Sequence, residues 1–216
     1  MVIVKICGLT TLEDSLLAVA AQADMLGFNF YPPSPRYISP QACRSIVAEL
    51  KQQPVRPVLV GVFANAGLDE INGILETCGL DLAQLSGDEP PALLEVLGER
   101  AFKALRPSGP ASLRECVGRY PRRKSPPAWL VDAHQAGSYG GSGRRADWNL
   151  AAGLAAQAPV LLAGGLTPEN VAAAIARVHP WGVDVASGVE SSPGKKDRTK
   201  MEEFIQSANQ AGMESG

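Results

Sequence analysis

A lysine and a cysteine stand two residues apart near the start of the chain, in the stretch "KICG" at residues 5–8. The preceding "VIV" is β-branched and favours a buried strand. A cysteine there is most often an inert apolar residue, but a buried lysine is costly unless it is paired. Because side chains alternate across a strand, Lys5 and Cys7 face the same side. A nearby cation lowers the pKa of a thiol, so Cys7 is a candidate proton carrier.

The second candidate proton carrier is Asp132, at the end of an expected strand over Ala128–Asp132. A thiol and a carboxyl group that face each other across a pocket can act as base and acid. Packing for Cys7 and a loop or capping role for Asp132 are the alternatives. Asp184, within the last expected strand, is predicted to pair with Lys5, because an interior lysine needs an interior acid.

Three further features indicate an anionic ligand. Gly164-Gly165 and Ser187-Gly188 follow the last two expected strands, and glycines let backbone N–H groups approach a phosphate, especially where a helix begins. Tight turns alone would also use glycine, but two such pairs, with "GGSG" at 140–143 nearby, favour a phosphate site. Arg36, whose backbone is restricted by the preceding proline in "SPR", suits a carboxylate, although an ordinary exposed arginine is the alternative.

The elements that must position these residues alternate between short apolar runs and helical patterns. The expected strands are Val2–Cys7, Met25–Phe30, Val58–Phe63, Leu80–Leu85, Phe102–Leu105, Ala128–Asp132, Val160–Ala163 and Val183–Ala186. The expected helices are Leu12–Gln22, Pro40–Gln52, Leu68–Cys78, Pro90–Leu97, Ala111–Val117, Trp148–Ala156, Pro168–Val178 and Met201–Asn209. Thr11 and Thr167 are expected to cap the first and seventh of these helices.

Eight strand–helix units in 216 residues leave roughly 27 residues for each, which suits a compact (β/α)₈ TIM barrel. Strands that are apolar at successive positions indicate a parallel sheet covered on both faces. An open doubly wound sheet is the alternative, but the first turn lacks the G-x-G-x-x-G pattern. We therefore expect one α/β barrel domain over 1–216, with a frayed tail from about residue 209.

The composition excludes several classes of protein. The net charge is −2, which gives no strong field for nucleic acid or an anionic membrane. No apolar run is long enough to span a membrane, and no signal peptide is evident. The four cysteines are scattered, which argues against a disulfide framework or a zinc site and favours the reducing cytoplasm. We expect a monomer with a small-molecule partner.

Seven motifs together resemble the phosphoribosylanthranilate isomerase family of tryptophan biosynthesis, an aromatic amino-acid pathway. They are "KICGLT", "GFNFYPPSPRYIS", "VGVFAN", "QLSGDE", "LVD…YGGSG…DW", "LLAGGLTPENV" and "GVDVASGVESSPGKKD", and they run from Val2 to about Phe204. The resemblance implies a single barrel and an Amadori rearrangement without metal or organic cofactor. Its substrate would be N-(5-phosphoribosyl)anthranilate and its product 1-(2-carboxyphenylamino)-1-deoxyribulose 5-phosphate.

The resemblance also implies a role for each candidate residue. Cys7 matches the general base, Asp132 the general acid, and Arg36 the residue that binds the anthranilate carboxylate. The phosphate-binding residues would be Gly141, Gly164, Gly165, Ser187 and Gly188, and Asp184 matches an acid near the site. The chain departs from the family at two positions. Ser86 stands where the family usually has histidine in "QLHGxE", and Ser142 replaces the common threonine in "GGTG".

Two other functions remain open on these residues. One is a different metal-free sugar-phosphate isomerase; a metal-dependent epimerase would need more histidines than His134 and His179. A histidine-pathway isomerase would place acids after the first and fifth strands, where this chain has Cys7 and Leu105-Arg106. The other is a non-catalytic barrel that binds a phosphorylated metabolite, which a turnover assay would distinguish.

Overall fold

The computed structural model describes residues 1–132 and 146–214, and in it eight parallel strands close into a barrel. Each strand pairs with the next along the chain, and the eighth pairs with the first. The strands are β1 Ile3–Cys7, β2 Met25–Asn29, β3 Val58–Phe63, β4 Leu82–Leu85, β5 Ala101–Leu105, β6 Trp129–Val131, β7 Val160–Leu162 and β8 Gly182–Val185. The predicted fold class is confirmed. Gly141 lies outside the described residues, so its predicted role is not placed.

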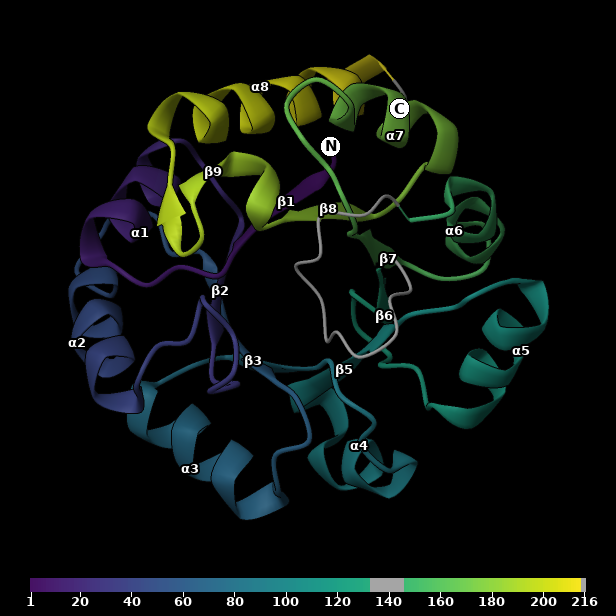
Figure 1. The fold of residues 1–216 in the computed structure, drawn as a ribbon, viewed down its shortest axis with the longest axis horizontal. Coiled ribbons are helices and arrows are strands. Elements are labelled where there is room, and N and C mark those ends of the chain that lie inside the picture. The colour runs from purple at the N-terminus through teal and green to yellow at the C-terminus, as the bar shows by residue number, and fades with distance from the viewer. Residues whose placement is uncertain (133–145, 215–216) are drawn as a thin grey trace.

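The helices surround the strands as an outer ring, which Figure 1 shows in a view down the barrel. They are α1 Leu12–Ala20, α2 Pro40–Leu50, α3 Leu68–Cys78, α4 Pro91–Leu97, α5 Pro110–Arg119, α6 Trp148–Ala155, α7 Val171–Val178 and α8 Arg198–Glu214. Two short 3₁₀ turns, η1 Gly98–Arg100 and η2 Ser187–Val189, follow α4 and β8. Within the described ranges, no helix is both long and apolar enough to cross a membrane.

Two apolar cores hold the layers together. One lies between the strands and the ring of helices, and the other fills the barrel interior. The interior core is built from Met25, Val60, Leu82, Phe102, Ala104, Leu130, Leu161 and Ala163. Burial on both faces explains why the strands are apolar at successive positions. The next layer, towards the carboxyl ends of the strands, is polar, and it forms the floor of the site described below.

Local signals set the ends of several helices. The Thr11 hydroxyl accepts a hydrogen bond from the Asp14 N–H at 3.1 Å, so the predicted cap of α1 is confirmed. Thr167 does not cap α7, which begins four residues later with Asn170 as its N-cap. The Asn170 side chain instead accepts from the Thr167 N–H at 2.9 Å and donates to the Gly165 carbonyl at 2.9 Å. This folded turn takes up the residues expected to form the first turn of the helix.

The C-terminal helix is longer than the sequence predicts. α8 runs to Glu214, so the expectation of a frayed tail from about residue 209 is wrong. Ala208 and Ala211 are buried, and a Cβ added to Gly212 would lie 2.9 Å from the Val2 nitrogen. The polar composition of the segment obscured these small residues, which let the helix lie close to the start of the chain.

A short antiparallel hairpin between β8 and α8 was not predicted. Its strands are β9 Glu190–Ser192 and β10 Lys195–Lys196. Pro193-Gly194 forms the turn, and Gly194 has a φ of +82°, the left-handed region that favours glycine. In Figure 1 the hairpin lies beside α1, and Lys196 of the hairpin hydrogen-bonds to Asp14 of α1 and to the Cys7 carbonyl at the end of β1.

Candidate active site

A cavity of about 360 Å³ opens at the carboxyl ends of the strands. This is the end of the barrel that carries chemistry in essentially all enzymes with this fold. Side chains from most strands line it, among them Cys7, Asn29, Arg36, Val62, Gln84, Ser86, Asp132 and Asp184. A smaller cavity of about 40 Å³ adjoins it and shares Asp132, Asp184 and Ala186 with it. The second cavity is otherwise formed by the turns after β7 and β8.

The predicted ion pair beneath the cavity is confirmed. Lys5 and Asp184 lie opposite each other in the register of β1 and β8, and the Lys5 Nζ lies 2.6 Å from the Asp184 Oδ1. The Lys5 side chain is fully buried. Burial alone would lower the pKa of Lys5, but the Asp184 carboxylate and the Cys7 sulfur together raise it above its usual value. The lysine therefore keeps its positive charge inside the barrel.

Cys7 faces the same side as Lys5, as the alternation of the strand predicts. Both side chains lie over Gly27 of β2, where an added Cβ would be 2.8 Å from the sulfur and 3.0 Å from the Lys5 Nζ. Burial raises the pKa of the Cys7 thiol, and Asp184 adds to this, while Lys5 and Lys196 oppose it. Most of the enzyme therefore carries the neutral thiol near neutral pH, and the two lysines favour the thiolate that remains.

We expect Lys5→Met to destabilise the fold by about 3 kcal/mol, because removing one partner of a buried ion pair leaves the other charge unpaired. The free energy of unfolding, measured by urea denaturation, checks this value. The double variant Lys5→Met/Asp184→Asn removes both charges and should recover part of the loss. Lys124→Met, at an exposed lysine, is the control. Equal stability of the parent and Lys5→Met would contradict the prediction.

Asp132 lies where both cavities meet. It directly follows β6, and its N–H donates to the Leu105 carbonyl at 2.9 Å, which continues the ladder between β5 and β6. Because it lines the same cavity as Cys7, the structure brings the two predicted proton carriers to one pocket.

The predicted glycine turns also lie together. Gly164 and Gly165 have φ values of +90° and +63°, which L side chains rarely adopt. Gly188 has no room for a side chain, because an added Cβ would overlap the Leu166 carbonyl oxygen. Both turns line the smaller cavity. One expectation is corrected: Gly164-Gly165 does not open α7 directly, since that helix begins only at Val171.

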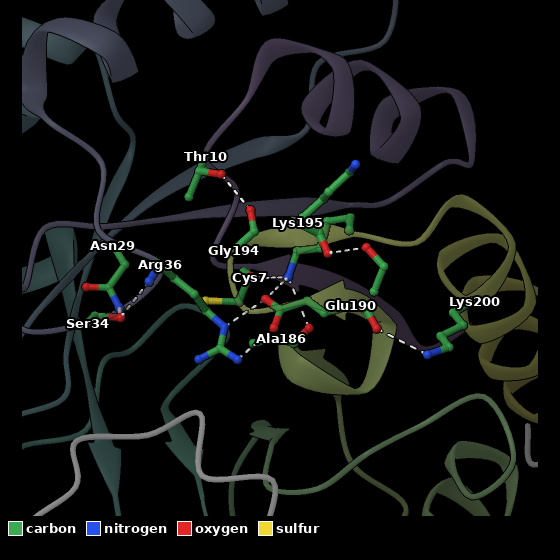
Figure 2. Close-up of polar contacts among 12 residues, drawn as sticks. Cys7, Thr10, Asn29, Ser34, Arg36, Ala186, Glu190, Gly194, Lys195 and Lys200 are labelled. Atoms are coloured by element: carbon green, nitrogen blue, oxygen red, sulfur yellow. Dashed lines mark hydrogen bonds and ion pairs between the residues drawn. The ribbon is translucent and has the colours of Figure 1, made fainter.

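Arg36 reaches the larger cavity, but its guanidinium already has a carboxylate partner. Its Nε and Nη2 each donate to one oxygen of Glu190, both at 2.7 Å (Figure 2). The backbone is also held, because the Arg36 N–H donates to the Ser34 hydroxyl at 3.1 Å and Asn29 donates to the same hydroxyl. Gly8 lets the arginine cross the end of β1, since an added Cβ would lie 2.5 Å from the Arg36 Cδ. The sequence therefore predicted the position of Arg36 but not its partner.

Ser86, where the family usually has histidine, lines the larger cavity and is buried. Its hydroxyl accepts a hydrogen bond from the Gln84 Nε2 at 3.2 Å. The Gln84 Oε1 is buried and, among the residues that the structure describes, has no hydrogen-bond partner. The described residues thus leave one buried polar atom beside the cavity unsatisfied.

Glu190 and Lys196 are the site residues that sequence reasoning missed. Both belong to the unpredicted hairpin, and the Lys196 Nζ lies 3.1 Å from the Glu190 Oε1. The Pro193-Gly194 turn was the available signal, because this dipeptide marks a tight reversal of the chain. Within residues 1–132 and 146–214, no three His, Cys, Asp or Glu side chains gather as metal ligands would. The absence of a cofactor stays a prediction.

Comparison with known proteins decides the family. A family model described as N-(5′-phosphoribosyl)anthranilate (PRA) isomerase matches residues 4–207. The chain belongs to this family. The N-(5′-phosphoribosyl)anthranilate isomerase of Geobacter sp. (strain M21) is 49% identical over 205 residues, which cover 95% of this chain and 97% of that protein. That of Pelobacter propionicus is 48% identical over 215 residues and covers 100% of this chain and 99% of its own.

Solved structures of the family agree with the fold. The phosphoribosylanthranilate isomerase of Thermotoga maritima is 38% identical with a TM-score of 0.85, over 97% of this chain and 100% of that one. A second structure is a complex with reduced 1-(o-carboxyphenylamino)-1-deoxyribulose 5-phosphate; it is 37% identical with a TM-score of 0.82, over 97% and 100% of the two chains. The predicted family resemblance is therefore confirmed.

Proposed function

We propose that Asp132 and Cys7 are the general acid and the general base of the isomerisation for which the family of this chain is named. The substrate is N-(5-phosphoribosyl)anthranilate and the product is 1-(2-carboxyphenylamino)-1-deoxyribulose 5-phosphate, in the third step from chorismate to tryptophan. The observation that carries the assignment of roles is that a thiol and a carboxyl group from distant strands line one pocket.

The reaction needs one proton donor and one proton acceptor. Asp132 protonates the ring oxygen of the ribose, and the furanose opens to a Schiff base. The Cys7 thiolate then removes the proton from C2′, and the enolamine that forms relaxes to the ketone. Lys5 and Lys196 support the thiolate, because their charges offset part of the effect of burial on the pKa of Cys7.

The two cavities suit the two ends of this substrate. Arg36 lines the larger cavity and would bind the anthranilate carboxylate, since a guanidinium matches a carboxylate in shape and charge. The backbone of Gly164, Gly165, Ser187 and Gly188 lines the smaller cavity and would bind the phosphate. Asp132 and Asp184 line both cavities, which leaves the reacting sugar between the two anchors.

A turnover assay tests the proposed function. The purified protein is offered phosphoribosylanthranilate, and the loss of substrate fluorescence is followed with time. We expect loss that is proportional to enzyme concentration. Binding of the substrate without turnover would instead support the non-catalytic barrel, and turnover of another sugar phosphate alone would support the alternative isomerase.

We expect Gly188→Ala to raise KM at least tenfold, because the turn must move away from the Leu166 carbonyl. A hydrogen bond to a charged group contributes about 1.5–3 kcal/mol, and about 1.4 kcal/mol corresponds to a factor of ten. Competitive inhibition by inorganic phosphate should weaken by the same factor. Gly153→Ala is the matched control, since nothing lies within 4 Å of its added Cβ. Unchanged inhibition by phosphate in Gly188→Ala would place the phosphate elsewhere.

The monomeric state and the cytoplasmic location stay predictions. The Thermotoga maritima isomerase is described as dimeric. Sedimentation equilibrium of this protein would measure its mass directly, and a mass near 22.7 kDa would support a monomer.

A further inference from the structure

The carboxylate of Glu190 raises a problem for the binding of an anion at Arg36. The two side chains form a doubly hydrogen-bonded pair, with the Arg36 side chain 10% and the Glu190 side chain 5% exposed. A guanidinium paired in this way has its charge neutralised. A substrate carboxylate that approached this pair alone would meet no net positive charge, and it would lie near a second carboxylate.

Lys196 supplies the missing charge. Its side chain is fully buried, and its Nζ donates to the Glu190 Oε1 at 3.1 Å. The same nitrogen donates to the Cys7 carbonyl at 2.6 Å and to the Ala186 carbonyl at 3.0 Å. Burial lowers the pKa of Lys196, and the Glu190 carboxylate opposes this effect. Three acceptors satisfy the three N–H groups of the ammonium, which stabilises the charged form in this buried position. Arg36, Glu190 and Lys196 together carry one net positive charge.

The surrounding charges do not cancel this excess. The Asp14 carboxylate accepts from the Lys196 N–H and the Lys200 ammonium donates to the Glu190 carbonyl, so these two add one negative and one positive charge. Lys5 is balanced by Asp184 at 2.6 Å, and burial favours the neutral form of the Cys7 thiol by raising its pKa. Burial alone would raise the pKa of Glu190, but Arg36 and Lys196 together hold it below its usual value. Glu190 therefore stays ionised and oriented, and the excess positive charge remains beside the cavity that Arg36 lines.

The hairpin that carries Lys196 is fixed on both sides. The Lys196 N–H donates to the Asp14 carboxylate at 3.1 Å, and the Thr10 hydroxyl donates to the Gly194 carbonyl at 2.6 Å. Figure 2 shows Thr10 and Gly194 on one side of the site and Arg36 and Glu190 on the other. Lys196 is thus held at one place relative to both Cys7 and Arg36.

We propose that Lys196 is a positioning residue whose positive charge allows the Arg36–Glu190 pair to bind the carboxylate of the substrate. The proposal rests on the proposed role of Arg36. The hairpin then has two roles. Glu190 orients the Arg36 guanidinium, and Lys196 offsets the negative charge of the Glu190 carboxylate. Arg36 then keeps its remaining N–H groups, and a net positive charge, for the ligand.

Two ligands that differ by one carboxylate test the proposal. The first is reduced 1-(o-carboxyphenylamino)-1-deoxyribulose 5-phosphate, and the second is the same compound without the carboxylate, both measured by calorimetry. The Kd of the compound without the carboxylate, divided by the Kd of the compound that has it, reports the contribution of the carboxylate alone. We expect Lys196→Met to reduce this ratio about tenfold, since a unit charge a few ångströms away changes binding by that order. The compound without the carboxylate should bind as it does to the parent protein.

The controls separate charge from structure. Lys195→Met removes an exposed lysine of the same hairpin and should leave the ratio unchanged. Lys196→Gln keeps an N–H donor but no charge, and it should reduce the ratio as Lys196→Met does. An unchanged ratio, equal weakening of both ligands, or loss of folding in both variants would overturn the proposal, since each makes Lys196 a structural residue. A ratio near one in the parent itself would instead refute the role of Arg36.

Discussion

Cys7→Ser lowers kcat by about 10²–10⁴-fold, the effect that we expect from losing a general base. Serine keeps the size of the side chain, but its hydroxyl is far too weakly acidic to give an anion near neutral pH. Binding of the reduced product analogue should persist, because neither Arg36 nor the glycine turns are altered. Steady-state kinetics with the substrate above KM, together with calorimetry of the analogue, measure both quantities.

The pH dependence of kcat is a second test of the role of Cys7. The base is active as the thiolate, so the rate should increase with pH on the acidic side of the profile, and this ascending limb should vanish in Cys7→Ser. Burial raises the pKa of Cys7, so only a small fraction of the enzyme holds the thiolate near neutral pH. Cys116→Ser, at a half-buried cysteine of α5, is the control. Near-parent kcat in Cys7→Ala would make Cys7 a packing residue.

Asp132→Asn should lower kcat by a similar factor, about 10²–10⁴-fold, because the amide keeps the shape of the carboxyl group but cannot donate its proton. KM should change much less, since the proposed anchors for the phosphate and the carboxylate remain. The descending limb of the pH profile should disappear with the acid. Because the base must be ionised while the acid is protonated, the two limbs have to be assigned by variant and not by value.

The matched control for this change is Asp69→Asn, an exposed carboxyl group in the first turn of α3. It should retain the activity of the parent. The open-chain Schiff base of ribose 5-phosphate and anthranilate, supplied directly, should be converted by Asp132→Asn more readily than the cyclic form. Equal impairment with both forms would argue that Asp132 does not act in ring opening.

The barrel could be predicted because its signals are local. The strands are mostly apolar on both faces, and the expected and observed bounds of β3 and α3 are identical. The pairing of Lys5 with Asp184 could also be predicted, because ring closure makes the first and last strands neighbours and a buried lysine needs an acid. In both cases, the pattern of apolar residues or the need to pair a buried charge is compatible with only one arrangement in a closed barrel.

The partner of Arg36 could not be predicted, since it depends on an element too short to show periodicity. The strands β9 and β10 have three and two residues, so no alternation identifies them. Lys196 follows another lysine, and nothing in the sequence distinguishes the buried side chain from its exposed neighbour. The burial of Lys196 follows from contacts with residue 186 and with residues 7 and 14, and the last two lie far away along the chain.

The contacts of the hairpin determine when the active site can form during synthesis of the chain. Its contacts with Thr10 and Asp14 span 184 and 182 residues, and the Arg36–Glu190 pair spans 154. While the ribosome is still adding the last strand, β1 has no second neighbour, Lys5 has no acid, and Arg36 has no partner. Contacts of such long range form late, because the chain loses the entropy of closing a long loop before it gains the free energy of these contacts. The nascent chain therefore remains without a working site until nearly its whole length has been synthesised.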